Sequence, residues 1–146
     1  MSARRDDGTV MLLVLGLVVV AGLLIVVVID VSALFVARRD LLAAADGAAL
    51  AGAQAVDEAA VYREGVRGSL PLDPQRVETA VDDYLRDAGV PMGVDDLHVA
   101  VSTDGTTVRV RLSGVVHLPV VNAVTPGAAG GVDVAASASA RSAVLP

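Results

Sequence analysis

Side chains able to do chemistry are few in this chain of 146 residues, and their spacing matches no catalytic motif. His98 and His117 are too isolated for a metal site, so we interpret them as solvated or strand-face residues. The acidic pairs Asp82-Asp83 and Asp95-Asp96 are typical of solvated faces. Cysteine is absent, which excludes disulfides, thiolate metal sites and a cysteine nucleophile.

No Ser/His/Asp arrangement, glycine-rich phosphate loop or paired-carboxylate motif is recognisable in the sequence. The only candidates for an active site in the sequence are the apolar stretch 119–124 and scattered carboxylates. We therefore predict no catalytic, cofactor-binding or metal site, no small-molecule substrate and no enzyme activity.

The charge balance argues against a nucleic-acid partner. From Leu41 onward the chain carries 13 Asp and Glu residues against 7 Arg residues, and it has no basic patch. A nucleic-acid face needs clustered cations to neutralise phosphates, so this function class is excluded.

The dominant feature is an apolar run of 21 residues without a charge, from Thr9 to Ile29. A helix of that length reaches about 31 Å, which matches the hydrocarbon thickness of a bilayer. The run therefore predicts a single membrane span, and it is longer than the 7 to 15 apolar residues usual in a cleavable signal.

Two alternative fates of this segment stay open. A small-x-small site at Val31-Ser32-Ala33 would suit signal peptidase, and Gly8 is a candidate site for prepilin-type processing that leaves a chain starting at Thr9. We expect the span to be kept, without cleavage after Ala33.

The helical pattern does not stop at the end of the span. Residues 30–60 contain neither Pro nor a turn cluster, so one helix is expected to continue to about Ala60. At 100° per residue it carries a stripe of small apolar residues that suits close packing. The stripe comprises Leu41, Ala45, Ala48, Ala49, Gly52, Val56 and Ala59, of which Ala45, Ala49, Gly52 and Val56 are the main packing candidates.

The rest of the chain predicts a small α+β head. Asp73 as N-cap, Pro74 at the first position and Gly89 at the C-terminal end delimit a helix. Alternating residues around 97–101 and 108–112, separated by Asp104-Gly105, indicate a hairpin. We expect an apolar loop from Pro119 and a third strand from Val132, whose inward residues are small.

The expected fold class is α+β and pilin-like, with a long N-terminal helix packed on a small three-stranded antiparallel sheet and one extra helix. A module of about 75 residues is marginal for a self-sufficient core, so the sheet is expected to share its core with the long helix. The predicted divisions are a cytoplasmic tail (1–8), a transmembrane segment (9–37), an extracytoplasmic continuation of the helix (38–64) and the head (65–146).

The segment from Asp30 to Ala53, DVSALFVARRDLLAAADGAALAGA, resembles the N-terminal signature of the TadE/TadG-like proteins of Flp (tight adherence) pilus assembly. In that family an apolar span ends in Asp, followed by an aromatic or aliphatic residue, an Arg pair and an Ala-rich stretch. Leu42 departs from the family's frequent Gln, and Leu13 stands where processed pilins carry Glu. The matching positions are Asp30, Phe35, Arg38, Arg39, Ala44, Ala45, Asp46, Ala48, Ala49, Leu50, Ala51, Gly52 and Ala53.

The resemblance implies a single-pass cell-membrane protein with a cytoplasmic N-terminus and an extracytoplasmic head. It implies a minor pilin or assembly factor whose partners are membrane lipid and other pilus or secretion-system subunits, in a homo- or hetero-oligomer. Asp30, Arg38 and Arg39 are candidates for the membrane interface or a subunit contact, and Leu50 is a candidate partner contact. The alternative is a membrane-tethered binding module unrelated to pili, which gene neighbours lacking a secretion ATPase would favour.

Overall fold

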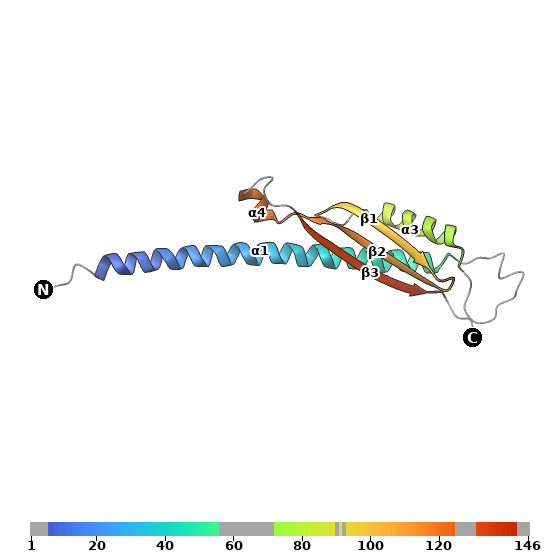
Figure 1. Cartoon of the computed structure of the whole chain (residues 1–146), viewed down its shortest axis with the longest axis horizontal. Helices are drawn as coiled ribbons and strands as arrows, with labels where there is room; N and C mark the ends of the chain where they lie inside the picture. The colour runs from blue at the N-terminus through green and yellow to red at the C-terminus, as the bar shows by residue number, and fades with distance from the viewer. Residues whose placement is uncertain (1–5, 56–71, 90, 92, 125–130, 143–146) are drawn as a thin grey trace, which may run out of the picture.

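The structure is a computed structural model that describes residues 6–55, 72–89, 91, 93–124 and 131–142. Helix α1 (Asp6–Ala53) is followed by helix α3 (Pro74–Ala88), strands β1 (Val94–Thr103) and β2 (Thr107–Val116), the short helix α4 (Pro119–Val124) and strand β3 (Val132–Arg141). Figure 1 shows α1 as a rod whose N-terminal half projects beyond all other elements, while its C-terminal half lies along the head.

Helix α1 has 48 residues, which corresponds to a length of about 72 Å. It is long and apolar enough to cross a membrane, and the side chains of its most apolar window are not buried against the protein. A core helix of a soluble protein would bury such a window. The first half of α1 therefore fits a single transmembrane span.

The head is an antiparallel meander in the order β1-β2-β3. Helix α3 forms where the sequence supplies its caps: the Asp73 side chain accepts a hydrogen bond from the Gln75 N–H at 2.9 Å, Pro74 opens the helix and Gly89 (φ 78°) closes it. Asp104 organises the β1–β2 turn by accepting from the backbone N–H groups of Thr106 and Thr107.

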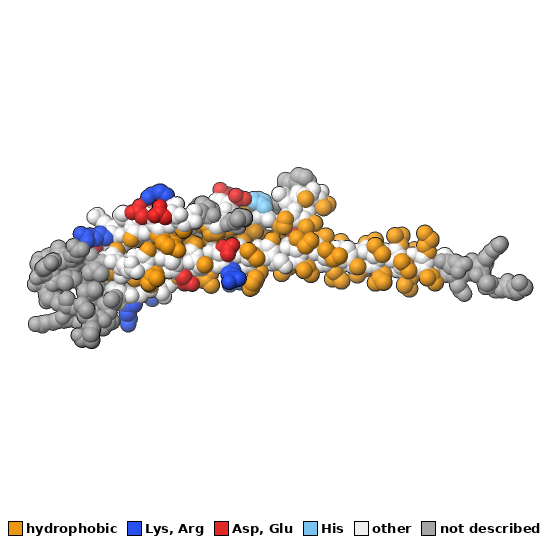
Figure 2. All heavy atoms as spheres, turned by 180° about the vertical axis from the view of Figure 1, so that it is seen from behind, with side chains coloured by type: hydrophobic (Ala, Val, Ile, Leu, Met, Phe, Trp, Pro, Cys, Tyr) orange, Lys and Arg blue, Asp and Glu red, His pale blue; other side chains and the backbone are white. Residues whose placement is uncertain are grey.

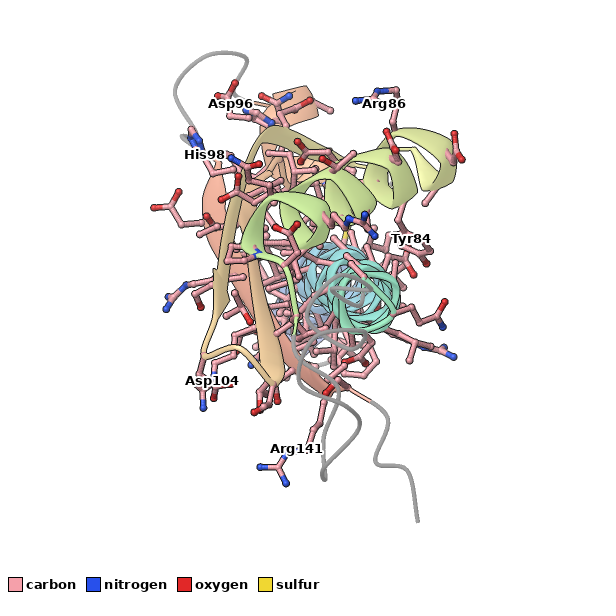
Figure 3. All side chains as sticks on the ribbon, turned by 90° about the vertical axis from the view of Figure 1, so that its right-hand side faces the viewer. Tyr84, Arg86, Asp96, His98, Asp104 and Arg141 are labelled. Carbon is pink, nitrogen blue, oxygen red and sulfur yellow. The ribbon has the colours of Figure 1, made fainter. Side chains whose placement is uncertain are left out.

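The core is formed between α1, α3 and one face of the sheet. Figure 3, which looks along α1, shows this helix beside the sheet with α3 above it, and α1 contacts β2, β3 and α3, so it is a central element of the head. The buried apolar side chains of α1 are Ala apart from Leu41, whereas those of α3 and β2 are Val and Leu. The fully buried side chains of largest volume are Leu41, Leu112, Val77, Val81, Val108 and Val110.

The α+β fold, the three-stranded antiparallel sheet and the packing of α1 on it are confirmed. Two expectations about element boundaries are wrong. Helix α1 ends at Ala53 and not near Ala60, because the Gln54 and Ala55 N–H groups turn back to Ala51 and Gly52, three residues earlier, and close the last turn. The stretch from Pro119 to Val124 is the short helix α4 and not a loop.

Candidate interaction surfaces

The small-residue stripe of α1 is the surface through which the helix holds the head. Ala45 and Ala49 are buried, with 0% and 1% of their surface exposed, and Gly52 is buried against Val77, Val81 and Val108. A Cβ built on Gly52 would lie 3.1 Å from the nearest atoms of Val81 and Val108, so the helix and the head are in close contact there. Val56, the fourth predicted packing residue, lies outside the described residues.

Asp30 forms a link between α1 and α4. The residue is only 5% exposed, and its carboxylate Oδ1 accepts a hydrogen bond from the backbone N–H of Val120 at 2.9 Å. A carboxylate within the hydrocarbon is costly, and hydrogen bonds to the charged form offset part of that cost. Asp30 therefore has an intramolecular partner at the end of the apolar run.

Two positively charged side chains follow Asp30 on α1, at positions 38 and 39. Arg38 and Arg39 are both exposed, about 12 and 14 Å further along the helix axis than Asp30. Their side chains are free to reach toward phosphate groups of lipid or toward a carboxylate of another subunit.

The side of α1 that faces away from the head carries large apolar side chains. Phe35, Leu42 and Leu50 are 70%, 45% and 57% exposed, and helical geometry places them within one sector of about 80°. We name these three residues the outer face of α1. Exposed apolar side chains aligned along one helix face are typical of a helix that has a partner.

A groove of about 560 Å³ lies where the head meets the rod. Its lining is mostly apolar and comes from α1, the start of β1 and the segment joining β2 to α4. The lining residues are Ser32, Ala33, Val36, Ala37, Asp40, Gly93, Val116, His117 and Pro119.

The face of the sheet turned away from α1 is polar and uncovered by any described element. Arg109 and Arg111 are exposed on β2, flanked across the ladder by Ser102 and Ala100 on β1 and by serines on β3. In Figure 3 the labelled charged side chains, among them Arg86 and Arg141, point outward. Two hollows open on this sheet face: Asp96, His98 and Asp133 are among the residues lining one, and Arg109 and Arg111 are among those lining the other.

The histidines lie apart. His98 is exposed on β1, whereas the His117 Nδ1 atom lies 3.0 Å from the Asp95 carboxylate across the β1–β2 ladder. Among the described residues, no group of three or more His, Cys, Asp or Glu side chains is placed to hold a metal ion. The pKa of the Asp104 carboxyl lies below its ordinary value because it accepts backbone hydrogen bonds from Thr106 and Thr107, but Asp104 is part of a turn rather than a site.

Gly8, the candidate processing site, lies exposed in the first turns of α1 with open space around its Cα. Sequence reasoning missed α4 and its link to Asp30. The signal that could have found them is the absence of any charge from Leu118 to Val132, a stretch that includes α4.

Comparison with known families places part of this chain in relation to one of them. Residues 8–61 match the family model of Flp pilus-assembly TadE/G-like proteins, which confirms the resemblance of the segment that starts at Asp30. This is a structural, pilus-assembly family, and the matched region covers the apolar half of α1 and its continuation along the head. No curated protein and no solved structure matches the chain.

Proposed function

We propose that this protein is a single-span structural or assembly component of an Flp/Tad-type pilus or a related secretion system, a minor pilin or assembly factor that acts by protein–protein contacts. The observation that carries the proposal is the coincidence of the family match with α1. The matched helix supplies both the apolar segment that fits a span and the outer face left uncovered by the head.

The outer face provides the physical means of assembly. Phe35, Leu42 and Leu50 lie on the part of α1 that runs along the head, so an apolar helix of another subunit could pack there without displacing β1, β2 or β3. Burial of exposed apolar surface favours association by about 25 cal/mol per Å² before the costs of ordering are subtracted. Asp46 and Arg39, exposed on the same sector, would provide polar contacts at its margin.

The proposed orientation places the N-terminus in the cytoplasm and the head outside. Arg4 and Arg5 before the span are matched by Arg38 and Arg39 after it, so the positive-inside rule favours neither orientation. The family match supports a cytoplasmic N-terminus. A reporter enzyme active only outside the cytoplasm, fused after Pro146, is expected to be active. A stably expressed but silent fusion would contradict this orientation.

The function is tested by deleting the gene in the bacterium that encodes the chain and counting surface pili by electron microscopy. Loss of pili, restored by the parent gene, would support the proposal. Restoration is expected to fail with Leu50→Ser combined with Phe35→Ser, and to succeed with Val99→Ser, a change of an exposed apolar residue on β1. Normal piliation of the deletion strain would contradict the proposal and favour a tethered binding module.

A further inference from the structure

Helix α4 lies beside α1 at the level where the apolar run ends. The link is the hydrogen bond from the Val120 N–H to Asp30, the residue that directly follows the run from Thr9 to Ile29. Figure 1 shows α4 extending from the head toward the N-terminal half of α1, and the two helices are in contact. If the apolar run crosses the bilayer, α4 lies at its surface.

The surface of α4 suits that position. Leu118 to Val132 contains no charged residue, whereas α3 and each of the three strands carry charged residues. Val124 is 75% exposed and Pro119 and Ala123 are also exposed, so apolar atoms of α4 are in contact with the surroundings. Figure 2 shows hydrophobic side chains on the head, on α4 and along the projecting rod, whereas the charged side chains seen in this view lie over the head.

We propose that α4 is a second membrane contact, inserted into the boundary between lipid headgroups and acyl chains, and that Asp30 holds it there. This inference rests on the membrane anchor of the proposed function. The exposed apolar surface of α4 adjoins the apolar surface of the span, so one lipid surface covers both. The headgroup region extends about 5 to 8 Å beyond the hydrocarbon on each side, and a helix lying flat is about 10 to 12 Å across, so one face of α4 would reach the acyl chains.

The buried carboxylate has a defined role in this arrangement. A backbone N–H at the start of α4 has no partner within the helix, and in lipid an unsatisfied group costs several kcal/mol. The Asp30 carboxylate accepts from one of these groups and is itself shielded, with 5% of its surface exposed. Each polar group thereby compensates the other at the membrane boundary.

Two contacts with the membrane would fix the inclination of the head. On a helical projection Phe35, 70% exposed, lies about 140° around α1 from Asp30 and about 8 Å further along the axis. The membrane would therefore be contacted by the span and by α4 on one side of the rod, while the outer face that begins at Phe35 is turned to another side. The head could then not pivot freely about the span, and the outer face of α1 would be held at a constant angle to the membrane.

The experiment uses full-length protein in vesicles of phosphatidylcholine and phosphatidylglycerol. Because the chain has no cysteine, Val124→Cys, Val20→Cys and Ser137→Cys each provide a single labelling site, for α4, the middle of the span and the exposed face of β3. Each is labelled with an environment-sensitive fluorophore and exposed to lipids that carry a nitroxide quencher on the acyl chain. We expect most of the emission to be lost at positions 20 and 124 and little at position 137.

The outcomes separate the proposal from the anchor on which it rests. Quenching at 20 but not at 124 overturns the role of α4 and leaves the span intact, whereas quenching at neither position overturns the span. Emission at 124 that shifts to the blue without quenching, and more so at higher protein density, would show that a second copy covers α4 and would also overturn the proposal. In the Asp30→Ala background, quenching at 124 is expected to fall while quenching at 20 is unchanged.

Discussion

The Asp30 carboxylate and the Val120 backbone N–H are joined by a 2.9 Å hydrogen bond across 90 positions of sequence. This bond connects the end of the apolar run of α1 to the segment between β2 and β3. It gives the head a point of attachment at the end of the apolar run, well separated from the packing stripe around Ala49.

Asp30→Ala is expected to release α4 without unfolding the head. The substitution leaves the Val120 N–H without its acceptor, and an unsatisfied buried group costs about 1 to 3 kcal/mol. Hydrogen exchange in the peptide containing Val120, measured by mass spectrometry on the full-length protein in detergent, should become faster. Asp30→Asn keeps an acceptor oxygen and should exchange nearly as slowly as the parent. Equal exchange in the parent and Asp30→Ala would show that the bond does not hold α4.

Ala49→Leu is expected to destabilise the head. Ala49 is 1% exposed, and overpacking of this kind typically costs about 1 to 3 kcal/mol. Thermal unfolding of the full-length protein in detergent should occur at a lower temperature. Ala43→Leu makes the same change on an exposed part of the same helix and should leave the transition nearly unchanged. If the two variants unfold alike, close packing at Ala49 does not hold the head.

Much of the fold could be predicted because its signals are local. Asp73, Pro74 and Gly89 delimit α3 through their own backbone preferences, and Asp104-Gly105 specifies the hairpin turn by its side-chain hydrogen bonds and by the positive φ of Gly105, 87°. No local signal marks the end of α1 at Ala53, since Gln54 and Ala55 are not residues that stop a helix. The boundary coincides with the end of the face that packs on α3 and the sheet.

The interaction surfaces likewise include features that the sequence predicts and features that depend on the three-dimensional fold. The burial of Ala45 and Ala49 follows from a periodic pattern, whereas the bond between Asp30 and Val120 depends on how β2 leaves the sheet and returns along α1. The alternation pattern also does not predict the β-bulge between Asp95 and His98, because one inserted residue reverses the alternation locally. The contacts of Arg38, Arg39 and Leu50 with lipid or partners stay predictions.

Asp104 in the β1–β2 turn should make the stability of the folded protein depend on pH in the acidic range. The pKa of Asp104 is lowered in the folded protein by hydrogen bonds from Thr106 and Thr107, so the folded state favours the charged carboxylate. This stabilisation is present above the ordinary aspartate pKa and is lost as the pH falls below about 4 through the lowered pKa. Thermal unfolding of the parent and Asp104→Asn should therefore differ at pH 7 and converge as the pH is lowered. A difference that stays constant with pH would contradict this role.

The mature form of the chain is testable by mass. Retention of the span predicts a membrane-extracted protein that begins either at the original N-terminus or at Thr9, because Gly8 is exposed at the start of α1 and accessible for processing. Intact-mass spectrometry distinguishes the two, and Gly8→Leu should abolish a product that begins at Thr9. A product that begins at Leu34 would refute the anchor, since it would remove Asp30 together with the apolar run.

Leu50→Ser is expected to separate assembly from stability. Leu50 is 57% exposed on the outer face of α1 and is absent from the buried core, so its loss should change the free energy of unfolding by no more than about 0.5 kcal/mol. If the outer face binds another subunit, removal of an apolar contact at its C-terminal end should weaken assembly, seen as fewer pili at unchanged protein level. Leu42→Ser, on the same face, should act in the same direction, whereas Val99→Ser on β1 should not. Full piliation with both Leu50→Ser and Leu42→Ser would show that subunits meet elsewhere, and the open face of the sheet around Arg109 and Arg111 would then be the next surface to test.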